Sequence, residues 1–284
     1  MKNIVIIPNV NKEGVFDAAK SVAAIILENG GSVFIDKQYG KEYEGFSQQY
    51  TEFPSDCELI IVIGGDGSVI DASVLAVKYD IPILGVNLGN LGYLAEIEPE
   101  SIGTVAKLFG NEYTVEKKML LFATKTDCDG NAVSSCRFAV NDVIISHESY
   151  LGVAEFMLIT DDNENVKYRA DGIIFSTPAG STAYSLSAGG PVVDHGINSI
   201  VATPICPHSF FNRSIIFNEN SKLTVKNTGK SSLKISIDGR LFEELDAGES
   251  CVVSKSDKTL KMVAFNANNM FSTLFSKMKK IENM

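Results

Sequence analysis

The feature that most constrains the fold is an apolar run that leads directly into a cluster of glycines. Residues 59–63 are all apolar and mostly β-branched, and residues 64–68 read Gly-Gly-Asp-Gly-Ser. An unbroken apolar run of this length is typical of a strand buried on both faces, as in a parallel sheet. Apolar residues then recur at helical spacing from Val69 to Ala76. The glycines therefore lie where a strand becomes a helix.

Such a junction is where open α/β sheets bind ligands, because loop amides and a helix N-terminus favour anions. Glycine also lets the backbone approach a phosphate closely. Asp66 is unexpected there, since it places a negative charge where an anion would bind. A carboxylate fits if it takes a proton from an attacking hydroxyl or holds a divalent metal. The alternative is a tight turn with Asp66 near the start of the helix, and the motif alone leaves both open.

Composition restricts the class of protein. The chain has 284 residues, of which 45% are hydrophobic and 21% are charged. These values are typical of a soluble globular protein with a large core, and the length allows two domains. The formal net charge of −10 argues against a general binder of nucleic acid or of membrane surfaces. Local phosphate binding by loops and helix ends stays open.

The cysteines and the N-terminus indicate the compartment. Five cysteines are scattered along the chain without a CxxC pair, which suits reduced thiols better than a disulfide framework. Met1 leads directly into a strand pattern, so no signal peptide is expected. Apolar runs are all shorter than a transmembrane helix requires. We therefore expect a cytoplasmic protein that binds neither nucleic acid nor a membrane.

The first part of the chain alternates between strand patterns and helix patterns. Strand patterns cover residues 2–7, 32–35, 59–63 and 81–86, and helix patterns cover residues 15–26, 69–79 and 99–109. The polar stretch 36–55 reads as a loop with a little helix. This alternation predicts a Rossmann-like parallel α/β domain over residues 1–112.

After residue 112 the strand patterns lie close together. They cover residues 113–126, 135–146, 153–159, 173–176, 199–205, 223–225, 233–237 and 260–265, with turn-rich links. Successive strands with polar turns indicate hairpins, so we expect a mostly antiparallel, sandwich-like β domain over residues 113–266. The tail, residues 267–284, is amphipathic and is predicted to form a helix that packs back on the first domain.

A second glycine-rich stretch runs from Asp171 to Val193. It is dense in small hydroxylated residues and contains one aromatic ring, Tyr184. A nucleotide site needs hydroxyls, accessible amides and a flat surface for the base. The alternative is a surface loop with a capped helix that begins near Ser181.

Asn141 and Asp142 lie together inside an apolar run. Two adjacent polar residues are costly there unless they are hydrogen-bonded or face a cleft. They are candidates for binding ribose hydroxyls, and a bulge or strand end is the alternative. His147 and His195 show no metal-ligand spacing, and we expect structural roles for both.

Several common nucleotide-binding motifs are missing from the sequence. It contains no GxxxxGK[ST], which excludes a P-loop enzyme. It has no GxGxxG after the first strand, which removes the usual fingerprint of dehydrogenases. No HRD and DFG pair of protein kinases is present.

Taken together, these motifs resemble the ordered signatures of NAD kinases. The resemblance rests on residues 64–68, Asn87 to Leu94, Asn141-Asp142 and Asp171 to Pro191, and it covers nearly the whole chain. The first motif is shared with diacylglycerol kinase, sphingosine kinase and phosphofructokinase relatives, whereas the last is highly specific. The resemblance implies transfer of the γ-phosphoryl group of ATP, or of polyphosphate in some members, to the 2′-hydroxyl of the adenosine ribose of NAD. The product would be NADP.

The resemblance also assigns a role to each matching residue. Asp66 would be the general base or the carboxylate that orients the hydroxyl. ATP phosphates would be bound by Gly64, Gly65, Gly67 and Ser68. NAD would be bound by Tyr93, Asn141, Asp142, Asp171, Thr182, Ala183, Tyr184, Ser187 and His208. Within this set Asp142 would hold ribose hydroxyls, Asp171 would lie near the nicotinamide, and residues 182–187 would line the adenine pocket.

Cofactors and partners follow from the same resemblance. It implies a divalent metal, usually Mg²⁺, although it assigns no protein side chain as a metal ligand, and it implies a homodimer or homotetramer. Asp142 stands where many bacterial members have Glu, which shortens the carboxylate by one methylene. The alternatives are a related kinase with another acceptor and a non-catalytic NAD(P)-sensing module. The intact Asp66 favours catalysis.

Overall fold

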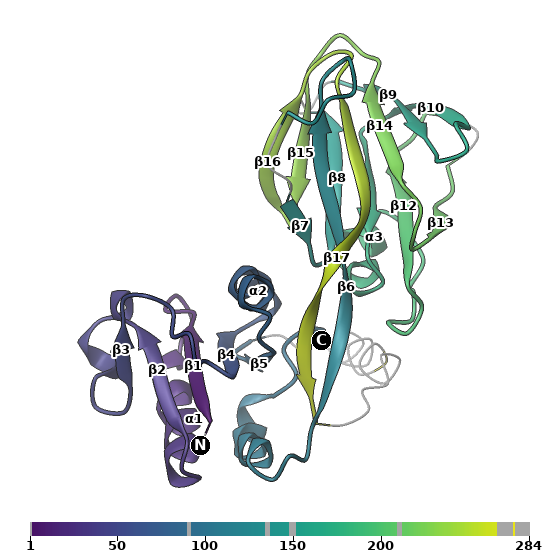
Figure 1. Cartoon of the computed structure of the whole chain (residues 1–284). Helices are drawn as coiled ribbons and strands as arrows, with labels where there is room; N and C mark the ends of the chain where they lie inside the picture. Colours follow the sequence, from purple (N-terminus) through teal and green to yellow (C-terminus); the bar gives the residue numbers. More distant parts are fainter. Residues whose placement is uncertain are drawn as a thin grey trace. The chain divides into compact units, whose positions relative to one another are not determined.

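Figure 1 shows the computed structural model, which forms two units. The first unit comprises Met1–Lys117 and Leu260–Met284, and the second comprises Lys118–Thr259. The structure describes residues 2–89, 92–133, 137–147, 152–208, 212–265 and 275. The predicted C-terminal helix over residues 267–284 lies outside the described residues, apart from Phe275. The domain limits at 112 and 266 stay predictions.

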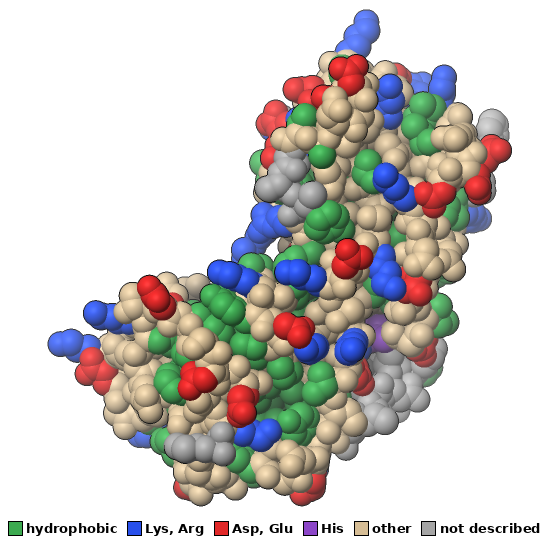
Figure 2. Space-filling model, in the orientation of Figure 1, with side chains coloured by type: hydrophobic (Ala, Val, Ile, Leu, Met, Phe, Trp, Pro, Cys, Tyr) green, Lys and Arg blue, Asp and Glu red, His purple; other side chains and the backbone are tan. Residues whose placement is uncertain are grey.

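The surface in Figure 2 carries acidic and basic side chains of the described residues interspersed with one another. The whole chain has 35 acidic and 25 basic residues. An anionic ligand is therefore attracted by local groups rather than by the net charge of the protein.

The first unit is built on a parallel sheet, as the apolar runs predict. Its strand order is β5-β4-β1-β2-β3. The strands are β1 (Asn3–Pro8), β2 (Ser32–Asp36), β3 (Gln48–Tyr50), β4 (Leu59–Gly64) and β5 (Ile83–Asn87). All residues of β4 and β5 are buried, because these strands lie in the middle of the sheet. The end of β17 (Ser250–Ala264) continues this sheet beside β5, where Met262 pairs with Ile83.

Helical segments cover the sheet of the first unit. They are α1 (Val15–Glu28), α2 (Asp66–Tyr79) and three 3₁₀ segments, η1 (Lys37–Tyr39), η2 (Lys41–Tyr43) and η3 (Pro99–Leu108). Alternate residues of the central strands, such as Ile61 and Ile63, pack with buried residues of α1 and η3. Val69 of α2 lies against Gly85 of β5, where an added Cβ would be 3.0 Å from its Cγ2. Gly85 thus lets α2 approach the sheet closely.

The second unit contains two antiparallel sheets. The six-stranded sheet has the order β13-β12-β11-β8-β15-β16. Its strands are β8 (Asp142–His147), β11 (Gly172–Ser176), β12 (Ser199–Ile205), β13 (Ile215–Asn218), β15 (Leu233–Ile237) and β16 (Arg240–Leu245). The other sheet contains β6 (Thr114–Thr126), β7 (Arg137–Ala139), β9 (Ala154–Ile159), β10 (Asn165–Ala170), β14 (Leu223–Asn227) and part of β17.

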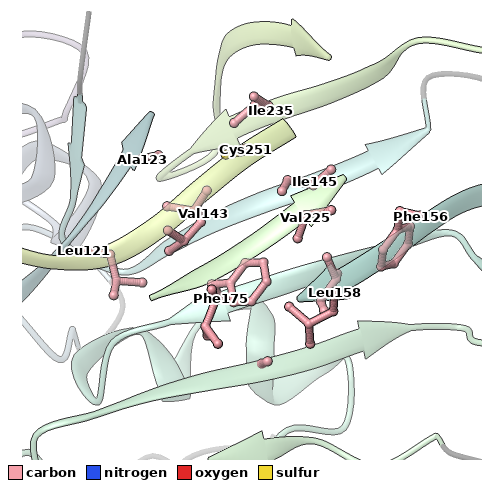
Figure 3. Packing of buried hydrophobic residues seen from close by; sticks show 14 of the residues in the cluster. Leu121, Ala123, Val143, Ile145, Phe156, Leu158, Phe175, Val225, Ile235 and Cys251 are labelled. Carbon is pink, nitrogen blue, oxygen red and sulfur yellow. The ribbon is translucent and has the colours of Figure 1, made fainter. Parts of the chain in front are cut away.

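One apolar cluster joins the inner faces of these two sheets. Figure 3 shows Phe175 of β11 and Val143 of β8 in the same cluster as Leu158 of β9 and Val225 of β14. All of these side chains are at most 1% exposed. Alternate residues of each strand supply the cluster, which is the pattern of a β-sandwich.

The predicted fold class is confirmed, with specific errors in the elements. The predicted strand over residues 135–146 is interrupted at Val140 and Asn141, which separate β7 from β8. Four strands were not predicted, namely β3, β10, β13 and β16. The last strand begins at Ser250 rather than at residue 260. Near Ser181, where a capped helix was the alternative to a nucleotide site, the structure has two short segments, η4 (Ala179–Thr182) and α3 (Tyr184–Ser187).

Candidate active site

The glycine motif lies at the predicted junction between a strand and a helix. β4 ends at Gly64 and α2 begins at Asp66. An added Cβ at Gly64 would be 2.7 Å from Ser68 Cβ, so only glycine fits there. The Ser68 hydroxyl accepts hydrogen bonds from Asn9 Nδ2 at 2.8 Å and from the Gly65 N–H at 3.4 Å. Ser68 therefore caps the first turn of α2, and its own hydroxyl proton stays available to a ligand.

Asp66 is the most tightly held group of this loop. Its Oδ2 accepts the N–H of Tyr93 at 2.7 Å, and its Oδ1 accepts those of Leu94 at 3.0 Å and Ala95 at 3.1 Å. An added Cβ at Gly92 would overlap the same carboxylate. Charge-assisted bonds of this kind are stronger than neutral ones. Asp66 thus joins the glycine loop after β4 to the loop after β5, which the sequence did not reveal.

Tyr93 lies next to this carboxylate, because its backbone N–H donates to Asp66 Oδ2. Its side chain is partly buried. Burial, with a smaller contribution from the negative charge of Asp66, raises the pKa of the Tyr93 phenol. The ring is therefore neutral at physiological pH and can offer a flat surface to a base.

In the second unit β8 begins at Asp142 and Asn141 directly precedes it, so the two residues stand at a strand end, which is one of the alternatives that the sequence left open. Their backbone is held by Asp238. Asp238 Oδ2 accepts the N–H of Val140 at 2.8 Å, and its Oδ1 accepts those of Asn141 at 2.7 Å and Asp142 at 3.1 Å. Thr177 holds the same segment from its carbonyl side, because its hydroxyl donates to Val140 O at 2.7 Å.

Sequence reasoning missed this function of Asp238. Asp238-Gly239 is a two-residue turn between β15 and β16, and both residues have positive φ, 49° and 76°. These angles fit a type I′ hairpin turn, and an Asp-Gly pair is a strong sequence signal for that turn. The contact with residues 140–142 is made by a side chain almost 100 positions away in sequence. No local pattern could have indicated it.

Asp142 has a different environment from Asp66. Its side chain is only 4% exposed, and within the described part of the chain no hydrogen bond reaches its carboxylate. Burial, with a smaller contribution from the negative charge of Asp238, raises the pKa of Asp142 to about 7. A buried carboxylate without a partner is costly. Asp142 is therefore suited to accept a hydrogen bond from a ligand hydroxyl.

Most hydroxyls of the stretch 171–193 are used inside the protein. Thr182 Oγ1 donates to Ala179 O at 3.2 Å, and Ser181 Oγ donates to Pro178 O at 2.7 Å. Ser181 Oγ also accepts the N–H of Val193 at 3.1 Å. The hydroxyl groups of Ser181 and Thr182 therefore stabilise the turn itself through hydrogen bonds to its backbone. Of the predicted NAD residues here, Tyr184 and Ser187 are exposed, while Thr182 and Ala183 are partly buried.

The structure brings some of the predicted NAD residues together and separates others. Gly180 packs against the backbone of Asn141, where an added Cβ would overlap the carbonyl group. The turn that carries Thr182 and Tyr184 therefore lies beside Asn141. Asp171 precedes β11, at the opposite end of this strand from Ser176, which pairs with Asp142. Five residues of strand separate the two ends by roughly 15 Å.

His147 and His208 make contacts within the protein. His147 Nε2 lies 3.4 Å from Asp171 Oδ1, so the predicted nicotinamide residue has a protein partner. The His208 backbone N–H donates to Arg169 O at 2.7 Å, and the next three residues lie outside the described part. Among the described residues there is no group of three or more His, Cys, Asp or Glu side chains that could hold a metal ion. None of the described helices is both long and apolar enough to cross a membrane.

Comparison with protein-family models gives two matches. Residues 4–113 match the ATP-NAD kinase N-terminal domain, and residues 140–265 match the ATP-NAD kinase C-terminal domain. Among curated proteins, the NAD kinase of Caldanaerobacter subterraneus subsp. tengcongensis is 33% identical over 282 residues, which is 98% of this chain and 99% of that protein. The NAD kinase of Lachnoclostridium phytofermentans is 35% identical over 284 residues, again 98% of this chain and 99% of the relative.

Two solved structures share the fold at lower sequence identity. The yeast NADH kinase complexed with NADH superposes with a TM-score of 0.83 at 22% identity, covering 96% of this chain and 86% of that one. An NAD kinase from Archaeoglobus fulgidus in complex with ATP has a TM-score of 0.73 at 22% identity, covering 98% and 99%.

Proposed function

The chain belongs to the NAD kinase family, and from that premise we propose how its residues divide the reaction among them. It is an enzyme that transfers a phosphoryl group from ATP to the 2′-hydroxyl of the adenosine ribose of NAD, which gives NADP. A non-catalytic NAD(P)-sensing module and a kinase with another acceptor are not favoured, because the curated relatives at about a third identity over nearly the full length are NAD kinases.

Asp66 is proposed as the general base, or the carboxylate that orients the attacking hydroxyl. The observation that carries this proposal is its set of three backbone N–H bonds. A carboxylate has about four acceptor positions, two on each oxygen. Oδ1 uses two and Oδ2 uses one, so Oδ2 keeps one position for a substrate hydroxyl. The N–H groups fix the carboxylate in advance, which lowers the cost of orienting the reactants.

The glycine loop is proposed to bind the phosphates of the donor. Gly67 has open space where a Cβ would be, and Gly65 has no atom closer than 3.9 Å there, so a phosphate can come close to the backbone of both. The Ser68 hydroxyl can donate its proton, because it acts as an acceptor toward Asn9 and Gly65. Gly64 serves the loop by its lack of a side chain. Together these groups replace part of the hydration of a phosphate.

The NAD residues are proposed mainly from the second unit. Asp142 is suited to accept a ribose hydroxyl, since its buried carboxylate has no partner among the described residues. Tyr184 is 46% exposed and offers an aromatic surface to the adenine. The remaining residues of this proposal are Tyr93, Asn141, Asp171, Thr182, Ala183, Ser187 and His208.

Mg²⁺ is proposed to accompany the donor. The described residues contain no group of three or more His, Cys, Asp or Glu side chains that could hold a metal ion. Three acceptor positions of the Asp66 carboxylate are occupied by backbone N–H groups. This donor set fits a metal held mainly by phosphate oxygens and water, as is common for Mg²⁺. When bound, the metal would neutralise charge on the phosphates.

A homodimer or homotetramer in the cytoplasm is proposed on the resemblance alone. Light scattering after size-exclusion chromatography tests the oligomeric state.

The proposed reaction is tested by incubating the purified protein with NAD, ATP and Mg²⁺. NADP is then measured with an NADP-specific dehydrogenase, which responds only when the phosphate is on the 2′-hydroxyl. We expect NADP to accumulate with time and enzyme concentration. The absence of NADP with either ATP or polyphosphate, in a protein that still binds NAD, would support the sensing module instead.

A further inference from the structure

A row of three hydroxyl groups links the short turn α3 to strand β12 and, beyond it, to Ser214, the residue before β13. Ser185 Oγ lies 3.1 Å from Thr203 Oγ1, and Thr203 Oγ1 lies 3.0 Å from Ser214 Oγ. Ser185 is fully buried and Thr203 is 1% exposed. Buried polar groups that lose their partner cost more than exposed ones. The row therefore stabilises one position of α3 on the sheet.

Gly190 encloses this row from the other side. Its N–H donates to Ser185 O at 2.8 Å. An added Cβ at Gly190 would lie 2.8 Å from Thr203 Oγ1 and would overlap Ser185 Oγ. The hydroxyls of Ser185 and Thr203 are thus in close contact with the backbone of Gly190. Ser185 is held through its side chain and its carbonyl group.

The neighbours of Ser185 point away from the sheet. Tyr184 is 46% exposed and Leu186 is 39% exposed, whereas Ser185 between them has no exposed surface. α3 has only four residues, and a helix this short has little stability of its own. The direction in which Tyr184 projects must therefore be set by the contacts of Ser185.

We propose that Thr203 is a positioning residue for NAD binding, which acts through Ser185 to hold α3 so that Tyr184 is presented to the adenine base. The inference rests on the proposed function, because it uses the placement of adenine at Tyr184. It adds a residue on β12 that no sequence motif indicated.

Strand β12 supplies a matched control for this proposal. Ser199 lies four residues before Thr203, so both side chains are on the same face of the sheet. Ser199 is 3% exposed, and its buried Oγ has no hydrogen-bond partner among the described residues. Ser199→Ala removes a buried hydroxyl from the same strand without touching α3.

The experiment compares Thr203→Val, Thr203→Ser and Ser199→Ala with the wild type. Valine keeps the shape of threonine and removes the hydroxyl, whereas serine keeps the hydroxyl. We expect Thr203→Val to raise KM for NAD by about three- to tenfold, the effect of losing one or two buried hydrogen bonds. KM for ATP and kcat should stay within about twofold, because only binding of one substrate is weakened. Thr203→Ser and Ser199→Ala should match the wild type.

A double variant tests whether Thr203 acts through Tyr184. Tyr184→Ala should raise KM for NAD, and adding Thr203→Val to it should cause little further increase, since the presented ring is already absent. An unchanged KM for NAD in Thr203→Val, an equal change in both KM values and kcat, or additive effects in the double variant would overturn the inference. If Tyr184→Ala itself leaves KM for NAD unchanged, the placement of adenine at Tyr184 is wrong.

Discussion

Asp66 and Asp142 are two carboxylates with opposite surroundings. Asp66 accepts three backbone N–H groups, and its position is determined by the protein alone. Asp142 is buried beside a second carboxylate, Asp238, and has no hydrogen-bond donor among the described residues. The carboxylate of Asp66 is held in position before the substrate binds, whereas the carboxylate of Asp142 would gain a hydrogen bond only from a bound ligand. Environment rather than residue type thus separates their proposed roles.

The raised pKa of Asp142 predicts a pH dependence of stability. In the unfolded chain the pKa of this carboxyl group is 3.8, and in the folded protein burial raises it to about 7. Between these values the folded protein keeps a proton that the unfolded chain has lost. The free energy of unfolding should therefore fall as pH rises from about 4 to 7 and level off above that. Asp142→Asn should remove part of this decline, on the order of 2 kcal/mol.

Urea unfolding at pH 4.5, 6 and 8 gives the free energy of unfolding of Asp142→Asn and of the wild type, and the difference between the two at each pH measures the contribution of Asp142. The exposed Asp129→Asn serves as the control for removal of a negative charge. A wild type whose unfolding free energy changes with pH in the same way as that of Asp142→Asn would show that Asp142 does not titrate in this range.

At the scale of elements, the break between β7 and β8 is what places Asn141 and Asp142. The strand pattern of residues 135–146 covers this segment as one run, and the adjacent polar residues Asn141 and Asp142 left a bulge or a strand end open as the alternative. The interruption comes from Asp238 and Thr177, which bind the N–H and C=O groups that a continuous strand would use in the sheet. Distant side chains therefore decide the local structure at the candidate site.

Gly180→Ala tests this packing directly. An added Cβ would overlap the carbonyl group of Asn141, so one of the two backbones must move. We expect a loss of about 1–3 kcal/mol in the free energy of unfolding, the usual cost of overpacking, and a higher KM for NAD. Gly103→Ala in η3 is the control, because nothing lies within 4 Å of its added Cβ. A fully stable Gly180→Ala with normal KM would contradict the close packing of these segments.

The strands that the sequence did not reveal share one property. β3, β10, β13 and β16 are the outermost strands in the order of their sheets. Among them β3, β10 and β16 carry polar or charged residues, which discourages pairing of edge strands with other chains. These three strands lack the apolar runs that made β4 and β5 evident, whereas β13 contains the apolar run Ile215 to Phe217 and was not predicted despite it. Periodicity predicts central strands well because those strands are buried on both faces.

At the scale of the whole molecule, each of the two units has an apolar core of its own. The fold class was predictable because the change from alternating strand and helix patterns to closely spaced strands is visible in the sequence. The reaction was predictable because residues 64–68 and 171–191 resemble signatures of NAD kinases, and the family models over residues 4–113 and 140–265 show that the chain belongs to this family. The contacts of Asp66, Asp238 and Thr203 were not predictable, since they join residues far apart in the chain.

The central claim is that Asp66 acts in the chemical step, and kcat of Asp66→Asn measures this most directly. Asp71→Asn, an exposed carboxylate of the same helix, is the control. Calorimetry measures NAD affinity, and amide hydrogen exchange at Leu94 and Ala95 reports whether their loop is still held. We predict that kcat for NADP formation falls about 10²- to 10⁴-fold in a folded variant that still binds NAD. A variant that keeps more than half of the activity would exclude Asp66 from this role.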